Sequence, residues 1–291
     1  MSEDALQPGL YLVATPIGNL GDITLRALEV LRGVDRIACE DTRQTQKLLN
    51  HFEIRTPTES CHEYNEAHRA SAFIRLIQEG KRIAVVTDAG MPGISDPGSG
   101  LVAAAVAAGV PVIPVPGANA AVSALVASGL PTEEFLFAGF PPEKAGARRT
   151  RLETLAAETA GTGRTLVFYE APHRILETLA DVAAVFPPGS RVVVARELTK
   201  VHEEFLRGTA EGVRAELSGR DRVRGEITLL IEAAAVRQDA AAARRIGERI
   251  AELTSGDGID EKEALKRLAR ETGRPKSELY RELQRERANR R

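Results

Sequence analysis

The sequence predicts an α/β protein with two sheet-containing lobes and a helical C-terminal segment. Short apolar runs alternate with helical patterns up to residue 116, which is typical of a parallel sheet whose strands are joined by helices. A second series of apolar runs follows this first series. From Arg237 onward strand patterns are absent, and Ala, Arg and Glu dominate the composition.

Length and composition agree with this architecture. At roughly 150 residues per domain, a chain of 291 residues suggests two domains. The two cysteines, Cys39 and Cys61, have neither metal-ligand nor disulfide-scaffold spacing, which predicts a reducing compartment and no metal site. No run reaches the roughly 18 apolar residues of a membrane span. We therefore expect a soluble, cytoplasmic protein with no membrane contact.

The first lobe is predicted to span residues 1–116. Its four apolar runs predict strands, and the segments between them predict helices that return the chain for parallel pairing. The expected strands are 10–14, 36–39, 83–86 and 112–115, and the expected helices include 24–32, 67–79 and 100–108.

The second lobe is predicted to span residues 117–235, with residues 120–128 forming a helix that connects the lobes. Because three of its strands follow one another without a long helix between them, we expect a mixed sheet with antiparallel members. The expected strands are 135–138, 165–169, 191–195, 204–207 and 226–231.

The C-terminal segment, residues 236–291, carries 15 Lys and Arg and 11 Asp and Glu, a net charge of +4. Its pattern predicts a helix over 260–272, a break at Gly273 and a second helix that starts at Pro275. The basic surplus favours contact with a nucleic acid, and a solvated pair of charged helices is the alternative interpretation.

The loop at residues 87–98 is the strongest candidate for a ligand site. It follows a buried strand and contains three glycines, two prolines and two aspartates. Parallel sheets bind small molecules at the carboxyl ends of their strands, so this loop is predicted to hold a ligand. An ordinary loop between strand and helix is the alternative.

Three further strand ends carry polar or glycine-containing motifs, at residues 14–22, 39–43 and 169–174, and a fourth motif lies at 196–200. The first lacks the third glycine of a dinucleotide-binding fingerprint, and no Gly-Lys-Ser/Thr phosphate loop or Gly-x-Ser-x-Gly nucleophile elbow is present. Helix capping explains each motif when it is considered alone. In the motif at 39–43, Asp41 or Thr42 would cap the following helix. Their convergence on one cleft is the functional hypothesis.

Together these motifs resemble the bacterial 16S rRNA ribose 2′-O-methyltransferases, which are members of the tetrapyrrole methylase superfamily. The resemblance implies two αβα lobes with S-adenosylmethionine (SAM) bound in the cleft between them, a small C-terminal helical domain and a homodimer. It also implies a cytidine ribose in the decoding region of 16S rRNA as the methyl acceptor. The motifs that carry the resemblance are residues 12–22, 40–43, 88–98, 114–120, 168–174 and 196–200.

The resemblance also implies roles for individual residues. The positions that would contact SAM are Pro16, Asp88, Ala89, Gly90, Ile94, Asn119, Ala120, Tyr169, Glu197 and Ile227. The catalytic set follows instead from what methyl transfer to a ribose hydroxyl requires: Asp41, Glu170, His173 and Lys200 are the candidate proton acceptors, and Arg43, Arg174 and Arg196 are candidates to bind RNA phosphates. For Lys200 to accept a proton, burial or the neighbouring Arg196 would have to lower its pKa.

Two alternatives stay open at this point. Another methyltransferase of the same superfamily would share the cofactor cleft and would not need a basic tail. A non-catalytic assembly factor that binds rRNA would keep the fold without the chemistry, which fits poorly with acidic and basic groups at four strand ends. Transfer of a labelled methyl group to small-subunit RNA separates all three.

Overall fold

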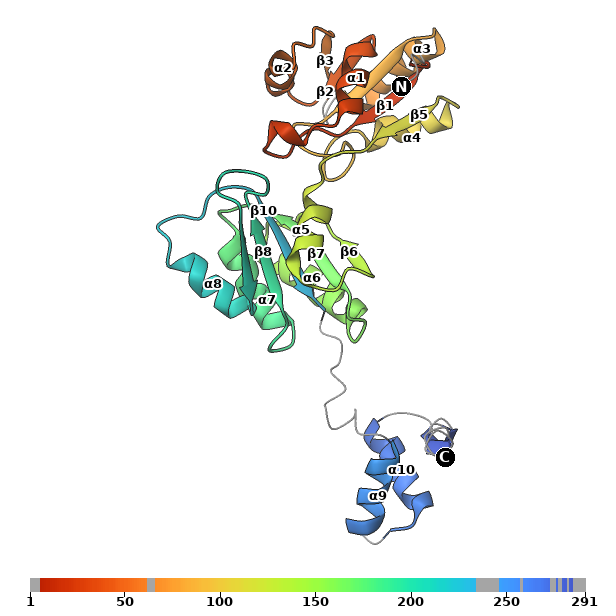
Figure 1. Ribbon diagram of the computed structural model, residues 1–291, viewed down its shortest axis with the longest axis vertical. Helices are drawn as coiled ribbons and strands as arrows, with labels where there is room; N and C mark the ends of the chain where they lie inside the picture. Colours follow the sequence, from red (N-terminus) through yellow and green to blue (C-terminus); the bar gives the residue numbers. More distant parts are fainter. Residues whose placement is uncertain are drawn as a thin grey trace. The chain divides into compact units, whose positions relative to one another are not determined.

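The computed structural model describes residues 6–61, 66–233, 246–256 and 259–272, together with residues 276, 279–281, 283 and 284. The chain divides into two compact units, Met1–Ala234 and Ala235–Arg291. The first unit contains two five-stranded sheets, and the second is helical (Figure 1). The division expected between residues 116 and 117 falls inside the first unit and stays a prediction.

The first sheet is entirely parallel, in the order β3-β2-β4-β1-β5. The four strands expected from the apolar runs are present, which confirms the parallel N-terminal sheet. The additional strand β3 is only three residues long and none of its residues is buried, so it leaves no apolar run in the sequence. The bounds are β1 Gly9–Val13, β2 Arg36–Cys39, β3 Thr58–Ser60, β4 Arg82–Val86 and β5 Val112–Val115.

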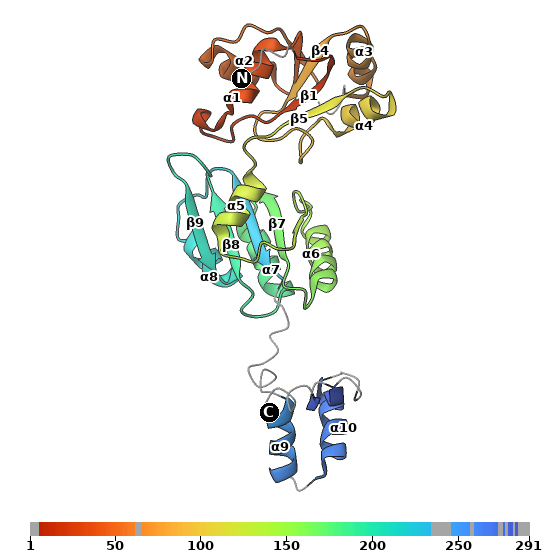
Figure 2. The same ribbon diagram turned by 45° about the vertical axis from the view of Figure 1, so that its right-hand side comes forward.

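Helices cover both faces of this sheet. Alternate strand residues point to opposite faces, and each face buries its own aliphatic cluster. Helices α1 (Leu25–Gly33) and α2 (Thr42–His51) pack on one face, and α3 (Glu66–Gln78) and α4 (Ser99–Ala107) pack on the other. The first lobe is therefore an αβα sandwich, and Figure 2 shows its helices on the two sides of the strands.

The second sheet is mixed, in the order β6-β7-β10-β8-β9. Only β6 and β7 pair in parallel, whereas β10 is antiparallel to both β7 and β8, and β8 is antiparallel to β9. The predicted mixed sheet is confirmed. The bounds are β6 Phe135–Phe137, β7 Thr165–Glu170, β8 Val192–Arg196, β9 Glu204–Gly208 and β10 Ile227–Glu232.

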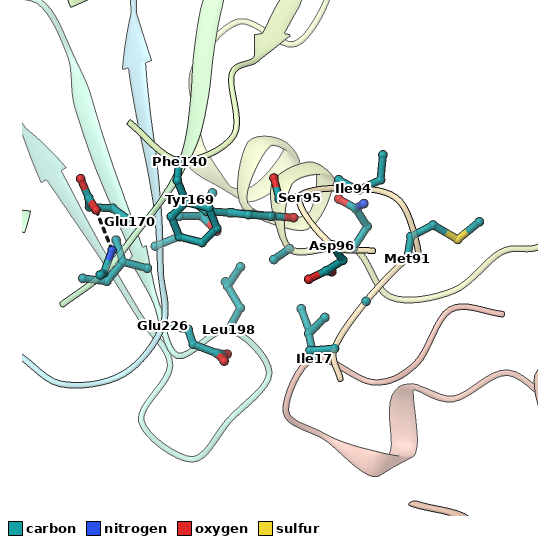
Figure 3. Close-up of a pocket in the computed structure, with 18 of the residues that line it drawn as sticks. Ile17, Met91, Ile94, Ser95, Asp96, Phe140, Tyr169, Glu170, Leu198 and Glu226 are labelled. Atoms are coloured by element: carbon teal, nitrogen blue, oxygen red, sulfur yellow. Dashed lines mark hydrogen bonds between the residues drawn. The ribbon is translucent and has the colours of Figure 1, made fainter. Parts of the chain in front are cut away.

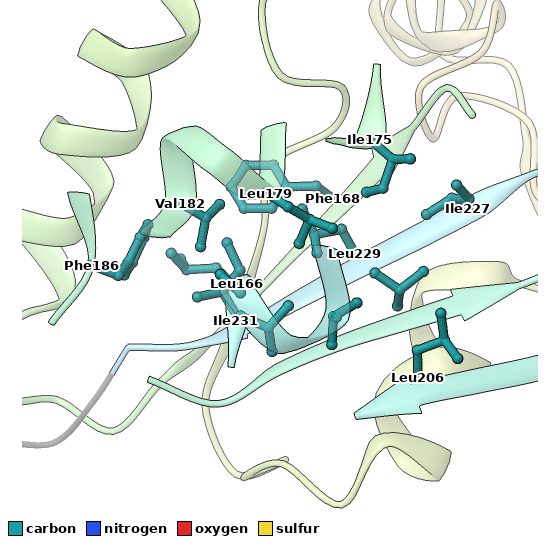
Figure 4. Close-up of a cluster of buried hydrophobic side chains, with 14 of the residues drawn as sticks. Leu166, Phe168, Ile175, Leu179, Val182, Phe186, Leu206, Ile227, Leu229 and Ile231 are labelled. Carbon is teal, nitrogen blue, oxygen red and sulfur yellow. The ribbon is translucent and has the colours of Figure 1, made fainter. Parts of the chain in front are cut away.

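The main core of the second lobe lies between this sheet and helices α6 (Ala145–Thr159), α7 (Ile175–Val185) and α8 (Ala210–Ser218). Figure 4 shows the side chains that meet there, from β7, α7, β9 and β10. Helix α5 (Ala120–Ser128) packs on the opposite face of the sheet. Ile17, from the first lobe, is buried in that second cluster, so the two lobes share one apolar contact region.

Side-chain caps fix the helix starts that border the carboxyl ends of the first sheet. The Asp41 carboxylate accepts a hydrogen bond from the Arg43 N–H at 2.8 Å, and the Asn119 side chain accepts one from the Val122 N–H at 3.0 Å. Such caps satisfy N–H groups that the helix itself leaves unpaired. A single turn of 3₁₀ helix, η1 (Leu20–Asp22), follows β1.

The second unit contains α9 (Ile246–Gly256) and α10 (Glu261–Thr272), whose apolar faces pack with Leu279 and Leu283. The predicted helix over 260–272 matches α10, with Asp260 accepting a hydrogen bond from the Glu263 N–H at its start. The predicted break at Gly273 and start at Pro275 lie outside the described residues. No described helix combines the length and apolarity needed to cross a membrane.

Candidate active site

A cavity of about 350 Å³ lies among the loops at the carboxyl ends of the first sheet and the strand ends of the second (Figure 3). Seven of its nineteen lining residues come from the first lobe and twelve from the second. The first lobe supplies Ile17 and the loop after β4, and the second supplies the start of α5, the ends of β7 and β8 and the start of β10. The lining residues are Ile17, Ala89, Gly90, Met91, Ile94, Ser95, Asp96, Asn119, Ala120, Phe140, Tyr169, Glu170, Ala171, Pro172, Ala195, Leu198, Glu226, Ile227 and Thr228.

The cavity lining is mostly apolar and carries acidic groups only. Asp96, Glu170 and Glu226 are its ionisable carboxylates, and no Lys or Arg lines it. An apolar surface with negative charge suits a ligand that combines an apolar ring with a positive charge. No cluster of three or more His, Cys, Asp or Glu suited to a metal ion occurs in the described part of the chain.

A short antiparallel backbone bridge joins Thr15 to Gly90, which lines the cavity. The Thr15 N–H donates to the Gly90 carbonyl at 2.9 Å, and the Gly90 N–H donates to the Thr15 carbonyl at 3.1 Å. The loop after β1 is thereby tied to the loop after β4. The N–H and the carbonyl of Gly90 are both used in this bridge.

The loop after β4 then turns sharply to present Asp96. Ser95 has a φ of +60°, a left-handed conformation that a non-glycine residue adopts at a free-energy cost, and Gly93 and Gly98 have φ values of +82° and +126°. The Gly93 N–H donates to the Pro97 carbonyl at 3.1 Å, which closes the turn. In Figure 3 the Asp96 carboxylate points toward the side of the cavity where Ile17 and Leu198 lie.

The surroundings strongly change the ionisation of Asp96 in the cavity. Burial raises the pKa of Asp96 to about 6, and the negative charges of Glu40 and Asp88 add to the rise. Asp96 makes no hydrogen bond or ion pair with the described part of the chain. Burial also raises the pKa of Asp88, whose carboxylate accepts a hydrogen bond from the Asp41 backbone and so links β4 to β2.

Glu170 lies at the end of β7, and its side chain is fully buried. Its carboxylate accepts hydrogen bonds from the Ala171 N–H at 2.8 Å, the Arg174 guanidinium at 2.6 Å and the Thr178 hydroxyl at 2.5 Å. The dashed line in Figure 3 marks the first of these bonds. The carboxylate is saturated by protein donors, so Glu170 fixes the turn that carries Ala171 and Pro172 into the cavity lining.

Lys200 lies just outside the lining, between two carboxylates. Its ammonium group is 2.8 Å from Glu197 and 2.9 Å from Glu226. Desolvation lowers the pKa of Lys200, but the hydrogen bonds from its ammonium group to the two carboxylates outweigh that effect and raise the pKa overall. The lowered pKa that a proton acceptor requires is therefore not found, and Lys200 stays charged.

The Lys200 stem also lies against Gly18 of the first lobe. A Cβ atom at position 18 would come within 2.6 Å of the lysine stem. Glycine at this position therefore makes room for a side chain that connects the two lobes at the cavity rim.

The cations of the predicted catalytic set have protein partners as well. The Arg43 guanidinium, 88% exposed, lies 3.0 Å from the carboxylate of its own helix cap, Asp41, which confirms the capping interpretation of this motif. Arg174 is mostly buried against Glu170. Asp41, Arg43, His173, Arg174 and Lys200 all lie outside the cavity lining, and Glu170 is the one member of the catalytic set within it.

With the geometry of the cavity established, the comparison with known proteins identifies the family. Residues 9–214 match the family of tetrapyrrole (corrin/porphyrin) methylases. The chain belongs to this family.

Curated relatives of this methylase match it over nearly its whole length. The ribosomal RNA small subunit methyltransferase I of Halalkalibacterium halodurans is 47% identical over 280 residues, 93% of each chain. The protein of the same name from Synechocystis is 46% identical over 273 residues, 93% of this chain and 95% of the relative. The Bacillus subtilis protein of that name is 42% identical over 277 residues, 93% of this chain and 92% of the relative.

Solved structures of other methylases have the same fold. The uroporphyrin-III-C-methyltransferase of Thermus thermophilus matches with a TM-score of 0.54 at 22% identity, over 78% of this chain and 96% of that one. A cobalt precorrin-4 methyltransferase matches with a TM-score of 0.54 at 17% identity, over 77% of this chain and 94% of that one. The predicted two-lobed α/β fold is confirmed.

Seven of the ten residues expected to contact SAM line the methylase cavity, namely Ala89, Gly90, Ile94, Asn119, Ala120, Tyr169 and Ile227. Pro16 lies between Thr15 of the backbone bridge and Ile17 of the lining. Asp88 links β4 to β2, and Glu197 binds Lys200 and the Glu226 N–H. These three residues support the cavity from outside its lining.

Eleven of the nineteen cavity residues were not among the predicted site residues, and Asp96, Phe140 and Glu226 are the charged and exposed aromatic ones among them. Asp96 belongs to the loop at 87–98, so its presence in the motif was a usable signal. Phe140 and Glu226 stand in loops beside strands of the second lobe. No local pattern distinguishes such residues from ordinary loop residues, because only the packing of the two lobes brings them to the cavity.

Proposed function

We propose that this chain is an rRNA methyltransferase that transfers a methyl group from SAM to the ribose 2′-hydroxyl of a cytidine in the decoding region of 16S rRNA. The observation that carries the cofactor assignment is the cavity itself, which combines apolar walls with three carboxylates and no cation. The relatives named ribosomal RNA small subunit methyltransferase I support the acceptor assignment.

The residues of the cavity fit SAM by chemical type. Ile17, Ile94 and Ile227 offer aliphatic surface for an adenine ring, and Glu226 offers negative charge to the positively charged groups of SAM. SAM supplies a methyl group already activated for transfer to an oxygen nucleophile. The protein then has to position the acceptor and remove a proton, and positioning supplies much of the rate enhancement.

Asp96 is the residue we assign to accept the proton of the 2′-hydroxyl. It faces the cavity and has no partner in the described chain, and its pKa of about 6 leaves it ionised at neutral pH and still basic. A proton acceptor whose pKa lies near the working pH contributes about 10² to 10⁴ in rate. The other candidates are less suitable, since Glu170 is saturated by donors and Lys200 is held charged.

The remaining basic residues of the predicted set support the reaction from the rim. Lys200 holds Glu226 and Glu197, and Arg174 holds Glu170, so both cations position carboxylates at or next to the cavity. Arg43 has an exposed guanidinium at the start of α2, where it is available to RNA phosphate.

The assembly and location belong to the same proposal. The chain is expected to act as a homodimer, as the resemblance implies, and a small-subunit rRNA substrate places its activity in the cytoplasm. Light scattering on the purified protein measures the oligomeric state, and a monomer at micromolar concentration would contradict the dimer.

The deciding experiment follows a tritiated methyl group from SAM into small ribosomal subunits isolated from cells that lack this protein. We expect label in 16S rRNA and, by mass spectrometry of the digested RNA, a 2′-O-methylated cytidine. The Gly90→Val variant is the inactive control. Label in a tetrapyrrole instead would identify a different activity of the family, and binding of the subunit without label would identify an assembly factor.

A further inference from the structure

Phe140 is an exposed aromatic side chain at the cavity. Its side chain is 53% exposed, more than that of any other described Phe or Tyr. A chain with 8 Phe, 4 Tyr and no Trp has few aromatic residues, and most described ones are at least partly buried. Because the exposed ring also lines the cavity, it is placed to contact a ligand that binds there.

The Phe140 ring is held in place at the rim. It makes an edge contact with the Tyr169 ring at a centroid distance of 5.7 Å and an interplanar angle of 62°, and Tyr169 in turn contacts Phe137 at 5.0 Å. Figure 3 shows Phe140 beside Tyr169 at the cavity. The ring therefore presents an ordered apolar surface.

The backbone before Phe140 is held by the second lobe and lies close to the first. The Gly139 carbonyl accepts a hydrogen bond from the Tyr169 N–H at 3.0 Å. Gly139 has a φ of +65°, and a Cβ at that position would lie 3.5 Å from the Ser95 hydroxyl of the first lobe. Phe140 is thus positioned where the loop that presents Asp96 meets the second lobe.

Positive charge follows this ring in the sequence. Lys144 and Arg151, at the start and in the second turn of α6, are exposed and form no ion pair with the described residues. No cation lines the cavity, and its Asp96 carboxylate has no cationic partner in the described chain, so the cavity does not favour phosphate. An RNA backbone is therefore expected to stay outside the cavity, near α6, while a single sugar enters.

Recognition of single RNA nucleotides commonly uses a base that is splayed out and stacked on an aromatic side chain. We propose that Phe140 is the stacking platform for the base of the target nucleotide, with Lys144 and Arg151 binding the flanking phosphates. This inference rests on the proposed rRNA methyltransferase function. It identifies the substrate at this step as an unstacked nucleotide of single-stranded RNA, whose ribose faces Asp96 while its base covers Phe140.

The test compares Phe140→Ala, Phe140→Leu and Phe140→Trp in the full-length chain, with SAM affinity measured by calorimetry and KM and kcat measured on small ribosomal subunits. We expect the Ala and Leu variants to raise KM for the subunit about five- to hundredfold, because loss of one stacking contact has effects of that size, with the SAM Kd unchanged. The Trp variant should keep a KM near that of the wild type. Phe135→Ala is the matched control, since Phe135 is 45% exposed in the same lobe and does not line the cavity.

Each other outcome contradicts the platform in a distinct way. An equal loss of SAM affinity in Phe140→Ala would assign the ring to the cofactor, and a change of oligomeric state in light scattering would assign it to a subunit contact. Unchanged KM in both the Ala and Leu variants would overturn the platform alone. A wild-type chain that methylates no small subunit would overturn the proposed function and the platform together.

Discussion

The ammonium group of Lys200 lies 2.9 Å from the carboxylate of Glu226, and so connects the loop after β8 to a residue of the cavity lining. The same ammonium group binds Glu197, whose carboxylate also accepts a hydrogen bond from the Glu226 N–H at 3.0 Å. One lysine thus fixes both the side chain and the backbone of Glu226.

Replacing Lys200 by Met is expected to lower methyl transfer about tenfold, because Glu226 loses its partner while the cofactor walls are kept. Calorimetry should show an SAM affinity near that of the wild type.

Since the pKa of Lys200 is raised, its deprotonation should contribute no rise in rate between pH 7 and 9 in the wild type. Lys81→Met, on the first lobe beside Asp35, is the control, and a loss of SAM affinity specific to Lys200→Met would show that Lys200 acts on the cofactor.

Gly90→Val is expected to weaken SAM binding by at least tenfold. Gly90 lines the cavity with a φ of +85°, and its two backbone bonds to Thr15 hold the loop after β4. A valine there adds a branched side chain beside Ile17, whose Cγ2 lies 3.5 Å from the added Cβ.

Gly80→Val separates backbone strain from cavity shape in this experiment. Gly80 has a φ of +93°, so valine is strained there too, but no atom lies within 4 Å of the added Cβ and the site is outside the cavity. Both variants should lose stability, and only Gly90→Val should lose SAM in calorimetry. Equal SAM affinity in the two folded variants would contradict the placement of the cofactor.

Glu170→Gln is expected to destabilise the protein by about 3–5 kcal/mol, the usual cost of breaking a buried ion pair and leaving its partner uncompensated. The variant leaves the mostly buried Arg174 without its carboxylate. Urea unfolding at pH 7 measures the loss. Glu177→Gln is the control, because Glu177 pairs with Arg148 from a position that is 70% exposed, and exposed partners contribute little. Equal losses for the two variants would contradict the structural role of Glu170.

Asp96→Asn is expected to lower methyl transfer by about 10² or more and to stabilise the protein at neutral pH. The pKa of Asp96 is raised in the folded state to about 6, so the folded protein binds its proton more tightly than the unfolded chain does. The resulting destabilisation is absent below about pH 4, grows between about pH 4 and 6, and is complete above pH 6. It amounts to roughly 1–2 kcal/mol after solvent screening.

Thermal unfolding checks this pH dependence directly. The Tm of Asp96→Asn should exceed that of the wild type at pH 8 and match it at pH 4. Asp35→Asn is a control for which the opposite result is expected. Hydrogen bonds from Arg82 lower the pKa of Asp35 to about 2, so loss of this carboxylate should destabilise the protein at pH 8. A Tm difference for Asp96→Asn that is the same at both pH values would contradict a half-buried carboxylate without a partner.

Much of this architecture could be predicted from the sequence, because the decisive signals are local. The apolar runs of β1, β4 and β10 report burial on both faces, and the lining residues Ala89, Gly90 and Asn119 lie directly in the loops that follow β4 and β5. The protonation of Lys200 depends on Glu226, 26 residues away, and the exposure of Phe140 depends on packing. Such long-range relationships have no local pattern.

The last prediction concerns the C-terminal unit, which carries a net charge of +4 over residues 236–291. A chain that ends at residue 235 should keep SAM binding and the dimer and lose affinity for the small subunit, because the cofactor cavity is built entirely from residues 17–228. Each lost phosphate contact should reduce the slope of log K against log salt by about 0.7–0.9. In the intact chain, Lys262→Glu with Lys266→Glu, both exposed on α10, should reproduce part of this loss without removing the unit. Equal subunit affinity of the full-length and shortened chains across a salt series would show that this unit makes no contact with RNA.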